Sequence, residues 1–263
     1  MDDVGSSDVG RLAVIADIHG NIPALEAVLA DLGRFEVDAV VCLGDVANGG
    51  PEPAAALARL RRLNAPTALG NTDASLLAPR TPADLPTPPP PGWEEHLEVE
   101  AWCAAQLGEA EKDYIRTFHP YLELTLAGLR VVAYHGSPKR FDDHVRSFTP
   151  DKRLAELLDD TPAEIYLGAH THEQFAKRYR GSIVMNPGSV GMAVRLTAAG
   201  EGWYPAAAEY ALVNVLGGQP SVHLRKVAYD LGRLQGAVKR SGMPHGDAYL
   251  ARFFRSAAVS HQS

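Results

Sequence analysis

Short apolar runs that alternate with helical patterns are the feature that most restricts the fold of this chain. Residues 11–16 (RLAVIA) and 37–43 (VDAVVCL) are rich in branched apolar residues, as is typical of strands buried on both faces. Between them, the segment that starts at Pro23 places leucines and valines at helical spacing and ends at Gly33. A strand, a helix and a second strand in succession predict a parallel βαβ unit with a right-handed crossover.

The same alternation continues along the chain and predicts one α/β layered domain over residues 1–263. The further segments are a helix at 52–63, a short third parallel strand at 65–69, a hairpin of 122–126 with 129–134, a helix at 150–159, strands at 164–167 and 182–185, and a hairpin of 209–216 with 221–228. The late hairpin adds antiparallel strands to the parallel ones.

Three segments fall outside this pattern. Residues 1–10 are small and acidic, and we expect them to form a flexible N-terminal tail. Residues 74–120 form an insertion that begins with a proline-rich loop and continues as two helical stretches, which could cap a neighbouring site. Residues 230–263 are predicted to be a C-terminal helical segment, broken near Gly242 and Pro244.

Composition excludes several classes of function. The net charge is −7, with no basic tract, so non-specific nucleic-acid binding is not expected. The two cysteines, Cys42 and Cys103, lie in a predicted strand and a predicted helix, which excludes a disulfide framework and fits a reducing compartment. We expect a cytoplasmic protein that has no membrane partner, because the start is not basic and no apolar run approaches the roughly 18 residues that span a bilayer.

Polar residues of the types that bind metals follow the ends of predicted strands five times. They are Asp17 with His19, Asp45, Asn71, His135, and His170 with His172. Because ligands bind at the carboxyl ends of strands in open α/β sheets, these residues are expected to converge. Seven such side chains exceed the need of one tetrahedral metal, whereas two metals that share a carboxylate need about this number.

Each position also has a simpler interpretation. The Asp17–His19 segment could form a turn, Asp45 could cap the following helix, and Asn71 could occupy a left-handed turn position. His170 and His172 are harder to explain in this way, since alternate residues of an extended segment point to the same side. Coincidence at all five places is improbable, so the pattern favours a metal site.

The order and spacing of these residues resemble the five sequence blocks of the calcineurin-like metallophosphoesterases. The matching segments are DIHGN at 17–21, GD at 44–45, GNTD at 70–73, HG at 135–136 and GAHTH at 168–172. NPGSVG at 186–191 is similar to the segment that follows the last ligands in the small bacterial phosphodiesterase branch. The resemblance implies a four-layer αββα sandwich with the ligands on loops at one edge.

The resemblance also implies how the ligands divide between two divalent metal ions. Asp17, His19 and His172 would hold one ion, Asn71, His135 and His170 would hold the other, and Asp45 would bridge both. Mn²⁺ is the metal we expect, with Fe, Zn²⁺ or Ni²⁺ as alternatives for such oxygen and nitrogen ligands. Two cations roughly 3.5–4 Å apart lower the pKa of a shared water, and the bridging hydroxide is then the nucleophile. Asp45, Asn71 and His135 would thus act in catalysis through the metals.

One position departs from the family pattern. Many members have Asn-His-Glu or Asn-His-Asp where this chain has Asn71-Thr72-Asp73, and that histidine is thought to protonate the leaving oxygen. Thr72 cannot act as a general acid at neutral pH, so the general acid is unassigned. His144 and Asp73 are weak candidates, although His144 also fits a surface histidine and Asp73 could orient a ligand or cap a helix. A cation at Lys139 or Arg140 could contact a substrate phosphate.

The sequence therefore predicts an enzyme that hydrolyses small phosphoesters, with phosphodiesters favoured because the small phosphodiesterase branch also often lacks the histidine. The alternatives are a phosphomonoesterase or dinucleoside-polyphosphate hydrolase that uses the same site, and a non-catalytic scaffold. Aromatic residues of the 74–120 insertion could wall the site or join two copies in a homo-oligomer. Five other histidines are expected to be solvated: His96, His119, His223, His245 and His261.

Overall fold

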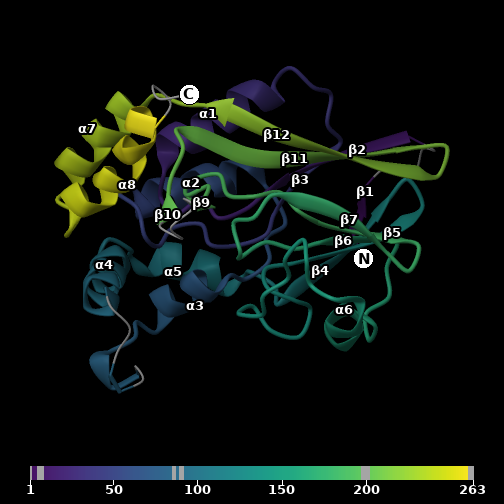
Figure 1. Ribbon diagram of the computed structural model, residues 1–263, viewed down its shortest axis with the longest axis horizontal. Coiled ribbons are helices and arrows are strands. Elements are labelled where there is room, and N and C mark those ends of the chain that lie inside the picture. The colour runs from purple at the N-terminus through teal and green to yellow at the C-terminus, as the bar shows by residue number, and fades with distance from the viewer. Residues whose placement is uncertain (1, 5–8, 85–86, 89–91, 197–201, 260–263) are drawn as a thin grey trace.

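The computed structural model describes residues 2–4, 9–84, 87–88, 92–196 and 202–259, in which two β-sheets lie at the centre (Figure 1). The larger sheet has the strand order β1 (Asp2–Val4), β4 (Tyr121–Leu126), β5 (Leu129–Tyr134), β6 (Ile165–Leu167), β8 (Ser182–Asn186) and β7 (Phe175–Tyr179). The smaller sheet has the order β12 (Gln219–Ala228), β11 (Ala207–Leu216), β2 (Val9–Ile15) and β3 (Ala39–Cys42). Strands β9 (Arg195–Leu196) and β10 (Gly202–Trp203) form a separate pair.

The side chains of β2 alternate between two hydrophobic layers. Leu12 and Val14 pack with residues of the larger sheet, such as Val131, in the layer between the sheets. Ala13 and Ile15 pack on the opposite side, against the helices. A strand whose two faces both lie in the core has to be apolar along its buried length, which explains why residues 12–16 form one continuous apolar run.

Helices cover the outer faces of both sheets and complete a four-layer αββα sandwich, as predicted. Those that contribute to the layer on the smaller sheet are α1 (Ile22–Leu32), α2 (Pro53–Leu63), α3 (Asn71–Leu77), α4 (Trp93–Ala105) and α5 (Glu109–Arg116). Helix α6 (Asp151–Leu158) packs on the larger sheet through Leu154, Leu157 and Leu158. Helices α7 (Leu231–Ser241) and α8 (Gly246–Val259) pack together around Leu234 and Phe253, at the same end of the molecule as α4 (Figure 1).

The first βαβ unit forms as expected. Strands β2 and β3 pair in parallel, with Val14 opposite Val41. The side chain of Asn21 accepts a hydrogen bond from Ala24 N and so starts α1, beside the proline in its first turn. The loop between the end of β2 and this cap is therefore short, and it carries Asp17 and His19.

Two expectations about strands need correction. Asp2–Val4, which we expected in a flexible tail, form β1 and pair in parallel with β4, because the edge of β4 offers free backbone groups; residues 1 and 5–8 lie outside the described part. Residues 65–69 make only isolated bridges, through Thr67 to Cys42 and through Ala68 to His119, instead of a regular third strand. Pro66 lacks the N–H that a regular ladder needs.

Among the described residues, a helix that was not predicted, α3, runs from the ligand segment into the insertion. The ligand segment at Asn71 is itself the start of α3, and a short 3₁₀ turn at Pro82–Asp84 then leads towards α4. Strand β7 was also not predicted. No helix in the described ranges is long and apolar enough to cross a lipid bilayer.

Candidate metal centre

Six predicted ligands form two groups at neighbouring loops after β2, β3, β5 and β6. The first group is Asp17, His19 and His172, and the second is Asp45, His135 and His170. Within each group the candidate ligand atoms lie within 4.8 Å of one another. Asn71, the seventh predicted ligand, joins the second group, with its Oδ1 3.1 Å from Nε2 of His135. The structure thus brings together all seven residues from five separate segments of the chain.

Asp45 lies between the two groups. Its Oδ2 is 3.3 Å from Nε2 of His135 in its own group and 3.9 Å from Nε2 of His19 in the other. The other oxygen, Oδ1, accepts a hydrogen bond of 2.9 Å from Thr72 N. A single carboxylate in this position can contact two cations at once, as the resemblance implied.

Backbone carbonyl groups fix the orientation of three histidine rings. The Nδ1 atoms of His19, His135 and His172 donate to the carbonyl oxygens of Asn48, Leu43 and Met192, respectively, at 2.7, 2.7 and 2.8 Å. With the proton on Nδ1, each neutral ring turns the lone pair of Nε2 towards the centre of the site.

The resulting contacts fit bound cations. The Nε2 atoms of His19 and His172 lie 3.2 Å apart, so their lone pairs face each other in the neutral rings. Nε2 of His172 is also 3.2 Å from Oδ1 of Asp17, and both carboxylate oxygens of Asp17 are buried with no hydrogen-bond partner among the described residues. Buried acceptors without hydrogen-bond donors destabilise the folded state. A divalent cation between them would offset this loss of stability. The donor set suits a transition metal ion.

Five of the ligands adopt a backbone conformation that is unfavourable for residues other than glycine. Their φ angles are positive: 54° for Asp17, 47° for His19, 54° for Asp45, 68° for His170 and 54° for His172. Each left-handed residue of this kind costs on the order of 1 kcal/mol and persists only where the surrounding structure imposes it. These strained residues occur together in the ligand loops. The strain lowers the stability of the fold, and such strain is typical of functional sites.

Charges within the site shift the pKa values of the ligands in different directions. Burial alone would raise the pKa of Asp45, but His135 holds it well below its usual range. Burial also opposes protonation of His135, yet the Asp45 carboxylate raises the pKa of His135 to about 9. Burial and the charge of His135 lower the pKa of His170 to about 4. Asp45 is therefore ionised, His170 neutral and His135 protonated at pH 7. A cation bound beside Asp45 would replace the His135 proton and leave Nε2 of His135 free to coordinate.

The NPGSVG segment connects the two halves of the centre, a role that the sequence did not reveal. Asn186 donates to the carbonyl oxygen of Ala169, and Ser189 Oγ donates to the carbonyl oxygen of Asp17, both at 2.8 Å. Met192 then supplies the carbonyl that orients His172. The segment thereby fixes the positions of ligand loops that are more than 150 residues apart in the chain.

Asp73 holds the backbone that carries Asp45. Its fully buried carboxylate accepts hydrogen bonds from Asp45 N, Val46 N and Gly70 N, at 2.7, 2.9 and 3.1 Å. Burial, together with the nearby charge of Asp45, raises the pKa of Asp73 to about 7. These contacts give Asp73 two of the roles that the sequence suggested. It caps α3, and it orients the loop that carries the ligand Asp45. Gly70 is required here, because a Cβ would lie 2.9 Å from Cγ of Asp45.

Replacement of Asp73 by asparagine is expected to destabilise the protein by about 2 kcal/mol, since the amide nitrogen cannot accept a hydrogen bond and leaves a buried N–H without a partner. Urea unfolding measures this difference in the free energy of unfolding. Asp84→Asn is the matched control, because the Asp84 carboxylate also accepts a backbone N–H, from Thr81, but at an exposed position. Equal stability of the two variants would contradict the proposed role of Asp73.

Comparison with known proteins supports the family assignment. The family model described as the calcineurin-like phosphoesterase superfamily domain matches residues 11–202. The chain belongs to this superfamily. An uncharacterized protein of Methanocaldococcus jannaschii is 25% identical over 182 residues, which are 68% of this chain and 69% of that protein.

Two solved structures share the fold of this phosphoesterase. A metallophosphoesterase from Sphaerobacter thermophilus has a TM-score of 0.71 and 22% identity, with 92% of this chain and 97% of that one covered. A hypothetical protein from Pyrococcus horikoshii also has a TM-score of 0.71, with 21% identity and coverage of 89% and 94%. Membership of the superfamily indicates a hydrolase that uses divalent metals.

Three further residues were predicted as candidates for the site, namely His144, Lys139 and Arg140, and only His144 contacts a proposed ligand. His144 is exposed, but its ring meets the ring of His170 edge-on, with centroids 4.7 Å apart, so it lies beside the second ligand group. Lys139 pairs with Asp160 at 2.6 Å, and Arg140 pairs with Asp142 at 2.7 Å. Both cations are therefore neutralised by carboxylates of their own surroundings.

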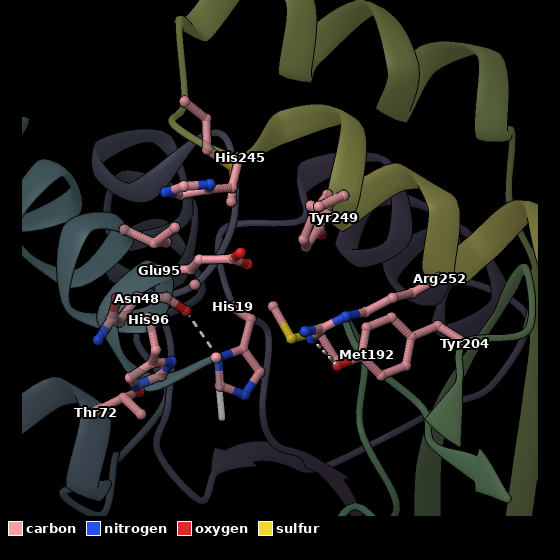
Figure 2. Close-up of a pocket in the computed structure, with 15 residues that line it drawn as sticks. His19, Asn48, Thr72, Glu95, His96, Met192, Tyr204, His245, Tyr249 and Arg252 are labelled. Carbon is pink, nitrogen blue, oxygen red and sulfur yellow. Dashed lines mark hydrogen bonds between the residues drawn. The ribbon is translucent and has the colours of Figure 1, made fainter. Parts of the chain in front are cut away.

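A pocket opens beside the first ligand group of the phosphoesterase (Figure 2). Its walls include residues of α4 on one side and of α8 on the other, and its lining includes His19 and Thr72. His96 and His245, which we expected to be simply solvated, are exposed and also line this pocket. This arrangement could not be predicted from the sequence, because the two walls are formed by segments about 150 residues apart that carry no shared motif.

Proposed function

We propose that this protein hydrolyses phosphodiesters at a centre of two divalent metal ions. The position of Asp45 carries the proposal, because one carboxylate lies within 4 Å of an imidazole from each ligand group. Asp17, His19 and His172 would hold one ion, and Asn71, His135 and His170 the other. Mn²⁺ is the metal we propose.

The residues of the chain prepare the site for this reaction. Two bound cations would supply a hydroxide at neutral pH and neutralise the charge that develops on the phosphoryl group. His19, His135 and His172 present Nε2 because backbone carbonyls hold Nδ1, and Asp73 fixes the loop that carries the shared carboxylate. This fixed arrangement means that little reorganisation is needed during the reaction.

Two features favour a diester over a monoester. Thr72 stands where many members of the superfamily have a histidine, and the small phosphodiesterase branch that the chain resembles also often lacks it. The pocket beside His19 also offers space for a second ester arm, which a monoester lacks. A phosphomonoesterase or dinucleoside-polyphosphate hydrolase is the second candidate, because the same centre can act on either. A non-catalytic scaffold is disfavoured by the complete ligand set.

The cellular location is also a proposal. Cys42 and Cys103 are both buried free thiols, which is consistent with a reducing compartment such as the cytoplasm.

Hydrolysis of bis-p-nitrophenyl phosphate, compared with p-nitrophenyl phosphate, tests the proposed function. The protein is first treated with a chelator, and Mn²⁺ is then added back. We expect a kcat/KM for the diester at least about tenfold above that for the monoester, which corresponds to about 1.4 kcal/mol. A preference for the monoester would support the second candidate, and the absence of bound metal would overturn the site assignment.

A further inference from the structure

The pocket between α4 and α8 is small and lies directly against the metal ligands. Its volume is about 200 Å³, and it is lined by His19 and by Thr72, the residue after the ligand Asn71 (Figure 2). Pockets for drug-sized ligands usually measure about 300–1,000 Å³, so this one has room for a single ring system. A phosphoester held at the metal centre therefore has space to place one of its arms in this pocket.

One wall of the pocket is aromatic and rigid. The rings of Tyr204 and Tyr249 each lie 5.1 Å from the ring of Phe253, measured between centroids, and Phe253 is fully buried. Met192 lies beside them in the lining. Because Phe253 fixes both tyrosines, a flat ligand can pack on this wall with little loss of side-chain entropy.

Three polar atoms that belong to lining residues lack hydrogen-bond partners. Asn48 Oδ1, Thr72 Oγ1 and Tyr249 Oη are buried, and none bonds to another described residue. Apart from these three and the two oxygens of Asp17, only two other buried side-chain atoms of the described residues are in this state. Unsatisfied buried polar groups are rare and costly, and their concentration here indicates a ligand that carries donors and acceptors.

A cation also faces the pocket. Arg252 donates from Nη1 to Tyr204 Oη at 3.1 Å, and its guanidinium lies 5.8 Å from the centre of that ring. It pairs with no carboxylate in the part of the chain that the structure describes. Arg80, which contacts the lining residue His96, pairs instead with Glu100. Arg252 therefore retains donors that can reach an acceptor on a ligand.

From these observations we infer that the pocket binds one ester arm of the substrate, and that this arm is a planar heteroaromatic ring with hydrogen-bonding edges. The inference rests on the proposed phosphodiester hydrolysis and specifies its substrate class. An alkyl arm would leave the polar atoms of Asn48, Thr72 and Tyr249 unsatisfied. A ring with both donors and acceptors satisfies them while it packs on the aromatic wall.

Three diesters with the same p-nitrophenyl leaving group and different second arms test this inference. The arms are methyl, benzyl and thymidine attached through its 5′ oxygen. With Mn²⁺ present, we expect KM for the thymidine ester to be about tenfold below that for the methyl ester, and the benzyl ester to lie between them. Because the leaving group is constant, the comparison reports on the second arm alone.

Variants locate the effect in the pocket. Tyr249→Phe keeps the ring and removes only the hydroxyl, and Arg252→Gln removes the charge. Each is expected to lower the preference for the thymidine ester over the methyl ester by about threefold to tenfold. Arg180→Gln is the matched control, because Arg180 also lies over a tyrosine, Tyr179, but far from the pocket, and it should leave the preference unchanged.

The outcomes separate the two proposals. If the methyl ester is hydrolysed but the thymidine ester has the same KM, the pocket assignment is wrong while the proposed function stands. If the benzyl ester equals the thymidine ester and Tyr249→Phe has no effect, the arm is not a hydrogen-bonding ring. If no diester is hydrolysed despite bound Mn²⁺, the proposed function itself fails.

Discussion

Asp45→Asn is expected to lower kcat/KM for bis-p-nitrophenyl phosphate on the order of 10³-fold, the upper range for loss of one preorganised electrostatic group. The side chains have the same shape, so the hydrogen bond from Thr72 N to Oδ1 can be kept. What is lost is the negative charge at Oδ2, which lies near imidazoles of both ligand groups. One substitution therefore weakens both metal positions.

Activity and metal content are measured together for this variant. Asp159→Asn is the control, because Asp159 also pairs with a cation, Arg180, but at an exposed position on the other side of the larger sheet. We expect the control to match the wild type in both measurements. An Asp45→Asn protein that binds two metals and keeps more than about a tenth of the wild-type activity would show that Asp45 does not bridge them.

Removal of metal is expected to lower the melting temperature on the order of 10 °C. Without cations, the Nε2 atoms of His19 and His172 face each other at 3.2 Å, and both oxygens of Asp17 stay unsatisfied. The left-handed ligand loops add strain that bound metal offsets. A ligand present at 1,000 times its Kd stabilises the folded state by about 4 kcal/mol, which corresponds to a shift of this size for a chain of this length.

Differential scanning calorimetry with chelator and with added Mn²⁺ measures the shift. His172→Ala should remove most of it, because the first ligand group loses one of its three members. His223→Ala, at an exposed position of β12, should retain the full shift. If chelation leaves the melting temperature of the wild type unchanged, the two groups do not hold metal in the folded protein.

Elements with a continuous apolar pattern could be predicted from the sequence. Strands β2 and β3 lie in the core on both faces, so every residue carries the signal, and α1 is marked by Pro23 and Gly33. The ligands were predictable for a related reason. Six of the seven follow such strands, where the topology forces the loops together, and Asn71 follows the bridged segment 65–69.

Other elements depend on contacts that no local pattern encodes. Strand β7 has the sequence FAKRY and buries only Phe175 and Tyr179, and it is ordered by antiparallel pairing with β8. Helix α3 is a short helix whose first residue is the ligand Asn71, and the sequence indicated it only through the possible capping role of Asp73. The positive φ angles of the ligands could not be inferred either, since they are imposed by hydrogen bonds between distant loops.

The match to the superfamily model ends at residue 202, and this boundary separates the metal ligands from one wall of the pocket. All seven ligands lie before it, whereas Tyr204, Tyr249 and Arg252 lie after it. The chain therefore keeps its reaction chemistry in one stretch and much of the pocket wall in another. If the pocket selects one ester arm, as inferred, exchange of α8 between relatives is expected to alter substrate choice while the metal ligands stay the same, because α8 supplies Tyr249 and Arg252 but no ligand.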